Sequence, residues 1–134
     1  MTIEKAMSSN VVTIAPSNTL VEAVRVMKEK KIKHLPVVDA SGSVVGVVTD
    51  RDLKEASASD ATTLEVHELL YLLDKVKIDS IMSKNVITIE KGSALKQAAQ
   101  IMVEKGIGCL PIVEGNKLSG IITRSDILRF FATS

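Results

Sequence analysis

The sequence predicts an α/β (α+β) fold of two pseudo-symmetric β-α-β-β-α repeats that pack sheet to sheet. Three observations support this: an internal duplication, short β-branched runs that alternate with helical-period segments, and 46% hydrophobic residues of which few are aromatic. When residues 7–39 are aligned with residues 82–114, 15 of the 33 pairs are identical. A long period with only two copies indicates a duplicated unit, because solenoids stack several shorter repeats.

Each repeat begins with a predicted strand and helix. The runs "VVTI" at 11–14 and "VITI" at 86–89 are β-branched, which favours strands. Apolar residues then recur at helical spacing in the segments that start at Leu20 and Leu95. Thr19 and Glu22 have the spacing of a capping box, so the first helix is expected to begin at Leu20.

Two more strands and a second helix complete each repeat. The runs "HLPVVD" and "VVGVVT" are joined across Ser41 and Gly42 by a predicted tight turn. Their continuous apolar character predicts a sheet that is covered on both faces. The following stretch "GVVTDRD" returns as "GIITRSD", and each threonine is expected to precede a helix.

The segment between the repeats predicts a loop at 57–63 and then a connector helix, because apolar residues recur at helical spacing over 66–76. This apolar stripe either closes the core or meets another subunit. We therefore assign residues 1–57 to the first repeat, 58–80 to the connector and 81–134 to the second repeat.

Charge and composition exclude several classes of function. The net charge of +1 and the aromatic content of 2% argue against a nucleic-acid partner, which requires a positive field or stacking platforms. Cys109 is the only cysteine, which excludes an internal disulfide and a thiolate metal site and favours a reducing compartment. The N-terminal residues have no apolar leader pattern, and no run approaches the roughly 20 apolar residues of a spanning helix. We expect a cytoplasmic protein with no membrane partner.

The duplicated stretches "NVVTI…HLPVVD…GVVTDRD" and "NVITI…CLPIVE…GIITRSD" resemble two cystathionine β-synthase (CBS) domains in tandem, a Bateman module. The connector is similar to that of stand-alone bacterial CBS pairs related to acetoin-utilisation regulators. The resemblance covers nearly the whole chain and implies a non-enzymatic regulatory module without a cofactor. It implies that AMP, ADP, ATP or S-adenosylmethionine binds in two clefts between the repeats, and that the bound state is signalled to an unidentified protein.

In this family a Thr-x-x-Asp motif binds the ribose and lies near the phosphate, and here it is Thr49 with Asp52 and Thr123 with Asp126. A carboxylate can accept both hydroxyls of a vicinal diol, while the start of the following helix favours an anion. The same spacing fits a capping box. The alternative is therefore a ligand-free dimerisation scaffold whose two motifs only cap helices.

The remaining cleft residues come from the resemblance alone. The cleft of Asp52 would be lined by Asn85, Val86, Val47, Gly108 and Cys109. The cleft of Asp126 would be lined by Asn10, Val11, Ile121, Lys33 and His34. With Arg124 beside Thr123, the basic residues of this second set predict that the Asp126 cleft is the better phosphate site.

Two residues also have a purely structural interpretation. His34 alone is more often a solvated or satisfied side chain than a ligand contact, and Cys109 is expected to be a buried, inert thiol. The sequence contains no catalytic constellation, so we do not expect an enzyme. The connector stripe and the terminal "DILRFF" carry more apolar surface than one core requires, which predicts a homodimer assembled through helices.

Overall fold

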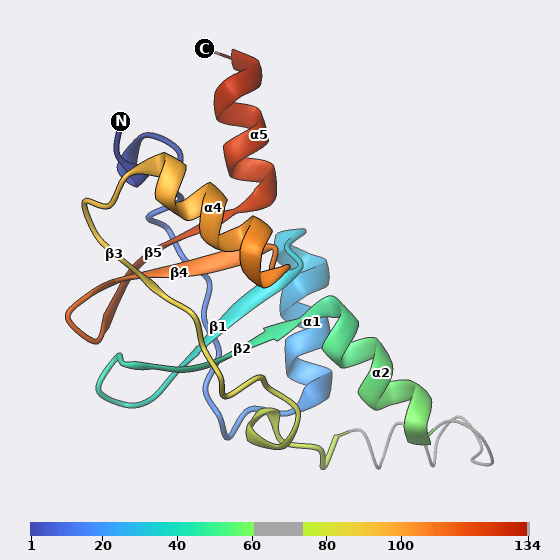
Figure 1. Cartoon of the computed structure of the whole chain (residues 1–134). Helices are drawn as coiled ribbons and strands as arrows, with labels where there is room; N and C mark the ends of the chain where they lie inside the picture. The colour runs from blue at the N-terminus through green and yellow to red at the C-terminus, as the bar shows by residue number, and fades with distance from the viewer. Residues whose placement is uncertain (61–73, 134) are drawn as a thin grey trace. The chain divides into compact units, whose positions relative to one another are not determined.

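The computed structural model describes residues 1–60 and 74–133, and its elements are labelled in Figure 1. The chain divides into two compact units that do not coincide with the sequence repeats. The N-repeat unit contains Val12–Ala40 and Val44–Val86, and the C-repeat unit contains Met1–Val11, Ser41–Ser43 and Ile87–Ser134. The segment that begins each repeat therefore belongs to the unit built mainly from the other repeat.

In the N-repeat unit, the predicted helix, hairpin and second helix are all present. They are α1 (Leu20–Lys30), β1 (His34–Val38), β2 (Val44–Thr49) and α2 (Asp50–Asp60), followed by the short 3-10 helix η2 (Ile78–Ser80). Strands β1 and β2 pair antiparallel, with His34 opposite Thr49. Helix α1 packs against both α2 and β1 (Figure 1).

The C-repeat unit repeats this order. It contains η1 (Ile3–Lys5), β3 (Ile89–Glu90), α4 (Leu95–Lys105), β4 (Cys109–Glu114), β5 (Lys117–Thr123) and α5 (Arg124–Thr133). Its sheet has the order β3-β4-β5, in which β3 is parallel to β4 and β4 is antiparallel to β5. Helix α5 packs against α4 and β5.

Each unit has its own core of buried aliphatic residues, as the scarcity of aromatic residues predicts. The N-repeat core consists of Ile14, Leu20, Ala23, Met27, Leu35, Val37, Val48, Leu53 and Ile78. The C-repeat core consists of Ile3, Ile89, Leu95, Ala98, Met102, Leu110, Ile112, Ile122 and Ile127. The apolar residues predicted at helical spacing are buried at three positions in each helix, Leu20, Ala23 and Met27 in α1 and Leu95, Ala98 and Met102 in α4. Val24, which follows the same spacing in α1, is 44% exposed.

The first strand of each repeat is shorter than predicted. In the first repeat only Ile14 pairs with β1, where it donates to the Pro36 carbonyl and accepts from Val38 N–H. In the second repeat the strand is Ile89–Glu90. A proline has no N–H to donate, so Pro36 and Pro111 cannot supply the next bond that would extend each parallel ladder toward the N-terminus.

The predicted loop at 57–63 is wrong in its first part, because α2 continues to Asp60. The Ser57 hydroxyl donates to the Leu53 carbonyl at 2.8 Å, so this polar residue is satisfied within the helix. Most of the predicted connector helix lies outside the described residues. Its last stripe residue, Val76, packs against the N-repeat core, and its carbonyl accepts from Leu20 N–H at 2.8 Å.

Candidate functional site

The first Thr-x-x-Asp motif lies where β2 ends and α2 begins. Thr49 N–H donates to Asp52 Oδ2 at 2.9 Å, and Asp52 N–H donates to Thr49 Oγ1 at 3.1 Å. This reciprocal pair satisfies two backbone donors at a helix start, which is the geometry of a capping box. These two hydrogen bonds hold both side chains at the junction of β2 and α2.

The second motif has the same geometry at the junction of β5 and α5. Thr123 N–H donates to Asp126 Oδ2 at 2.8 Å, and Asp126 N–H donates to Thr123 Oγ1 at 3.1 Å. In addition, Asp126 Oδ1 accepts from the Arg129 guanidinium at 3.2 Å. The duplication in sequence is thus a duplication in local structure, but the surroundings of the two carboxylates differ.

The segment that begins each repeat pairs with the strand before a motif. Val47 and Ser83 exchange two backbone hydrogen bonds at 3.1 and 2.9 Å in the N-repeat unit. Ile121 and Ser8 do the same at 2.9 and 3.0 Å in the C-repeat unit. Asn85 lies two residues after Ser83, and Asn10 lies two residues after Ser8. Both asparagines are exposed.

A glycine before each motif permits this close pairing. A Cβ at Gly46 would lie 2.5 Å from Met82 Sδ and 3.0 Å from the Ser83 carbonyl oxygen. A Cβ at Gly120 would lie 3.0 Å from the Ser8 carbonyl oxygen. These are contacts that a side chain could not make without displacing the segment, so the glycine of "GVVT" and "GIIT" has a packing role that spacing alone did not reveal.

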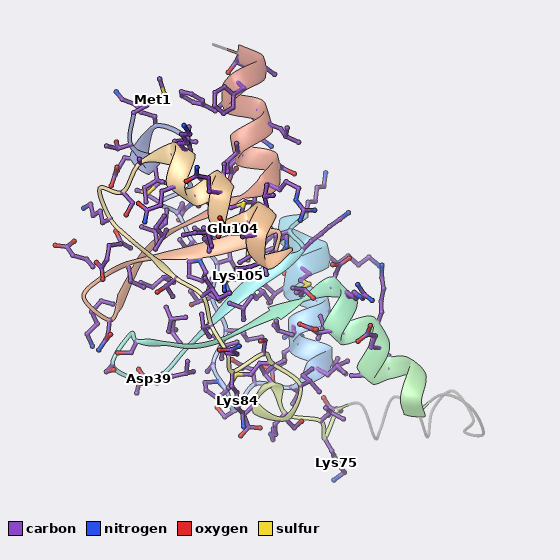
Figure 2. All side chains as sticks on the ribbon, in the orientation of Figure 1. Met1, Asp39, Lys75, Lys84, Glu104 and Lys105 are labelled. Carbon is purple, nitrogen blue, oxygen red and sulfur yellow. The ribbon has the colours of Figure 1, made fainter. Side chains whose placement is uncertain are left out.

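Part of each predicted cleft lining lies in the same compact unit as the aspartate to which it was assigned. Asn85, Val86 and Val47 share the N-repeat unit with Asp52, and Asn10, Val11 and Ile121 share the C-repeat unit with Asp126. Exposed Lys84, which is labelled in Figure 2, belongs to the same segment as Asn85.

Lys33, His34, Gly108 and Cys109 lie beside the motif of their own repeat. His34 is opposite Thr49, and the Lys33 carbonyl accepts from Asp50 N–H at 3.0 Å. Cys109 is opposite Thr123, and the Gly108 carbonyl accepts from Arg124 N–H at 2.9 Å. Their assignment to the cleft of the other repeat's aspartate remains a prediction from the resemblance.

The structure defines the protonation of Cys109 and the hydrogen bonding of Arg124, two side chains near the second motif. Burial raises the pKa of the Cys109 thiol from 9.0 to about 12, so the thiol stays protonated at neutral pH, and its expected burial is confirmed. The Arg124 guanidinium donates to the Ile107 carbonyl at 3.2 Å. Arg129 was not among the predicted site residues, although its i, i+3 spacing from Asp126 in "DILR" could have revealed the pair.

The C-repeat unit also has an open apolar pocket of about 310 Å³ between α4 and α5. Its lining includes Met102, Val103, Ile127 and Leu128, with Arg124 as the charged member. No group of three or more His, Cys, Asp or Glu side chains in residues 1–60 and 74–133 is arranged to hold a metal ion. Within the same ranges, no helix has both the length and the apolar character needed to cross a bilayer.

The fold defines two β-α-β-β-α repeats, each with a Thr-x-x-Asp motif that caps its second helix. The model of the CBS domain family matches residues 3–59 and 78–133. The chain belongs to the CBS domain family.

One relative of nearly the same length is a CBS domain-containing protein of Dictyostelium discoideum, 36% identical over 94% of this chain and 88% of its own length. Other relatives are longer. An uncharacterised protein of Methanocaldococcus jannaschii is 35% identical over 97% of this chain, which spans 47% of that protein. A homoserine O-acetyltransferase of Methanocorpusculum labreanum is matched over 23% of its length. CBS pairs thus also occur as parts of larger proteins, enzymes among them.

Solved structures match over almost the whole chain. A protein assigned to acetoin utilization (AcuB) from Vibrio cholerae gives a TM-score of 0.84 at 30% identity, over 99% of this chain and 91% of that one. CBSX2 of Arabidopsis thaliana in complex with AMP gives 0.81 at 27% identity, over 98% and 96%. A CBS domain pair in complex with 5′-methylthioadenosine and S-adenosyl-L-methionine gives 0.84 at 28% identity, over 99% and 97%.

Proposed function

We propose that this chain is a regulatory module that senses an adenosyl ligand, AMP, ADP, ATP or S-adenosylmethionine, through Asp52 and Asp126 and signals the bound state to a partner protein. The observation that carries the proposal is the pair of identically held Thr-x-x-Asp motifs. It is supported by similarity to one CBS protein in complex with AMP and to a CBS pair in complex with two adenosyl ligands.

The capping role of each aspartate is compatible with ligand binding. An ionised carboxylate offers about four lone-pair sites on two oxygens. The Thr49 and Thr123 N–H groups each take one site, on Oδ2 of the following aspartate. The cap therefore fixes the carboxylate in one orientation while leaving acceptor capacity for the two hydroxyls of a ribose, and the adjacent helix start favours a phosphate.

The test replaces each aspartate separately and measures affinity and stability together. In Asp52→Ala or Asp126→Ala, loss of the diol hydrogen bonds should weaken binding of AMP or S-adenosylmethionine at that motif by about 10- to 150-fold. Loss of the cap should lower the free energy of unfolding by about 1 kcal/mol. Isothermal titration calorimetry measures the first effect, and denaturation followed by circular dichroism measures the second.

A ligand-free scaffold is the second candidate, because motifs that only cap helices would form the same capping boxes. It predicts that both variants lose stability while the unsubstituted chain binds no adenosyl ligand. Calorimetry of the unsubstituted chain with AMP, ATP and S-adenosylmethionine distinguishes the two functions, because only the sensing module gives a saturable heat.

We further propose a cytoplasmic, non-enzymatic homodimer. The apolar pocket between α4 and α5 and the exposed side chains around it support helix-mediated assembly. The single buried cysteine supports a reducing compartment. The sequence contains no recognisable set of catalytic residues, which supports a regulatory role. In that role the partner protein would carry the regulated activity.

A further inference from the structure

The two aspartates differ in what their second carboxylate oxygen contacts. Asp126 accepts Thr123 N–H on Oδ2 at 2.8 Å and the Arg129 guanidinium on Oδ1 at 3.2 Å. The Asp126 side chain is 15% exposed, whereas that of Arg129 is 68% exposed. Both oxygens of Asp126 are thus engaged, one by the backbone and the other by a cation at the surface.

The first repeat has the opposite charge at the equivalent position. With the offset of 74 residues that aligns Thr123 with Thr49, Arg129 corresponds to Glu55. A carboxylate cannot donate to Asp52, and Glu55 instead accepts from the Arg51 Nε at 3.0 Å. In α2 the nearby cation, Arg51, therefore binds Glu55. In α5 the cation, Arg129, binds the carboxylate of the motif itself, Asp126.

The first turns of the two helices also differ in total charge. From the first helical residue to the position of Glu55, α2 carries Asp50, Asp52 and Glu55 against Arg51 and Lys54, a net charge of −1. The equivalent stretch of α5 carries Asp126 against Arg124 and Arg129, a net charge of +1. An uncharged ligand gains nothing from the extra cations, whereas an anionic ligand is attracted by them.

We infer that Arg129 is a specificity-determining residue, which competes with the ribose diol for Asp126 Oδ1 and biases this motif against uncharged adenosyl ligands. The inference rests on the proposed function. A ribose hydroxyl that binds Oδ1 must share or displace the Arg129 bond. An anionic ligand meets the same competition but is compensated by the positive charge that remains nearby. The Asp52 motif lacks this competitor and accepts uncharged adenosine more readily.

The experiment measures the Asp126 motif alone in an Asp52→Ala background. Calorimetric titrations with adenosine and with AMP compare Arg129→Gln with Arg129. Removing the competing cation should tighten adenosine binding by about two- to five-fold, the range expected for an exposed ion pair. AMP should gain less or lose affinity, so the ratio of AMP to adenosine affinity should fall. The adenosine gain should shrink at high salt, because salt screens the pair.

Matched variants separate this role from a general effect of surface charge. Arg129→Lys keeps the positive charge and should keep most of the ratio of AMP to adenosine affinity. Glu55→Gln in an Asp126→Ala background changes the equivalent residue of the first repeat and should alter adenosine affinity by less than about two-fold, since Glu55 does not contact Asp52.

Three outcomes would overturn the inference. If Arg129→Gln binds adenosine as the parent does, Arg129 does not compete for Asp126, and the proposed function stands. If Glu55→Gln gives the same gain, the effect is one of surface charge. If the unsubstituted chain binds neither adenosine, AMP nor S-adenosylmethionine, the proposed function fails and the role of Arg129 fails with it.

Discussion

At the scale of single residues, Cys109 links burial to pH dependence. Its thiol pKa is raised to about 12 by burial, whereas in the unfolded chain it titrates near 9.0. Between these two values the unfolded chain loses the thiol proton and the folded chain keeps it. The contribution of Cys109 is therefore fully present below pH 9 and is lost progressively as pH rises toward 12.

We predict that the free energy of unfolding falls more steeply over this alkaline range in the unsubstituted chain than in Cys109→Ala. Other groups titrate in the same range, so the difference between the two proteins is the quantity to measure, by urea denaturation at a series of pH values. Parallel pH profiles for the two proteins would contradict the burial of the thiol.

The sequence predicts the two motifs residue by residue because their spacing encodes a local hydrogen-bond pattern. Thr49 with Asp52 and Thr123 with Asp126 interact across one helical turn, and both pairs form as capping boxes. The role of Gly46 could not be read from the same pattern. It depends on Met82, which is distant in sequence and becomes a neighbour only when the unit assembles.

At the scale of elements, the two equivalent helices α1 and α4 begin differently. Thr19 caps α1, and its hydroxyl accepts from Glu22 N–H while the Glu22 carboxylate accepts from Thr19 N–H. The N-cap of α4 is exposed Ala94, with backbone φ −71° and ψ 140°, and it makes no side-chain cap hydrogen bond. Gln97 occupies the position that corresponds to Glu22.

This difference predicts opposite effects at equivalent positions. Thr19→Ala should lower the free energy of unfolding by about 0.5–2 kcal/mol, because two backbone groups lose their partners. Ala94→Thr should raise it, by a similar or smaller amount, because Ala94 already has the extended backbone of an N-cap and Gln97 can complete a capping box. Chemical denaturation followed by circular dichroism measures both. A destabilised Ala94→Thr protein would show that the bridge between Thr2 and Ala94 does not tolerate the larger side chain.

Helices and hairpins were the elements that the sequence predicted best, because periodicity and capping are local. The first strands were predicted too long, because their length depends on donors in another strand, where Pro36 and Pro111 have none. The end of α2 was predicted too early, because a serine-rich composition favours a loop only when its hydroxyls are not satisfied inside a helix.

At the scale of the whole molecule, equivalent exposed positions on the helices of the two repeats differ in polarity. Val103, Leu128 and Phe131 on α4 and α5 are 82%, 66% and 63% exposed. The equivalent residues of the first repeat, by the offsets of 75 and 74, are Lys28, Lys54 and Ser57. The same fold therefore tolerates polar side chains at these positions, so the fold itself does not require the apolar ones. Apolar surface beside an open pocket is typical of an interface.

We predict that the chain is a homodimer at micromolar concentration. Replacing exposed apolar residues of α4 and α5 by the lysines found at the equivalent positions of the first repeat should dissociate the dimer into monomers. Val103→Lys with Leu128→Lys places two charges in the proposed interface, where they would lose their hydration. Burying these charges in a dimer costs far more free energy than leaving the lysines exposed on a monomer. Because both positions are exposed, the variant should keep its circular dichroism spectrum and melting temperature as a monomer. Size-exclusion chromatography with light scattering gives the mass, and Lys28→Ala with Lys54→Ala is the matched control, which should remain dimeric. A monomeric unsubstituted chain would contradict the dimer, and a lysine variant that stays dimeric would place the interface elsewhere.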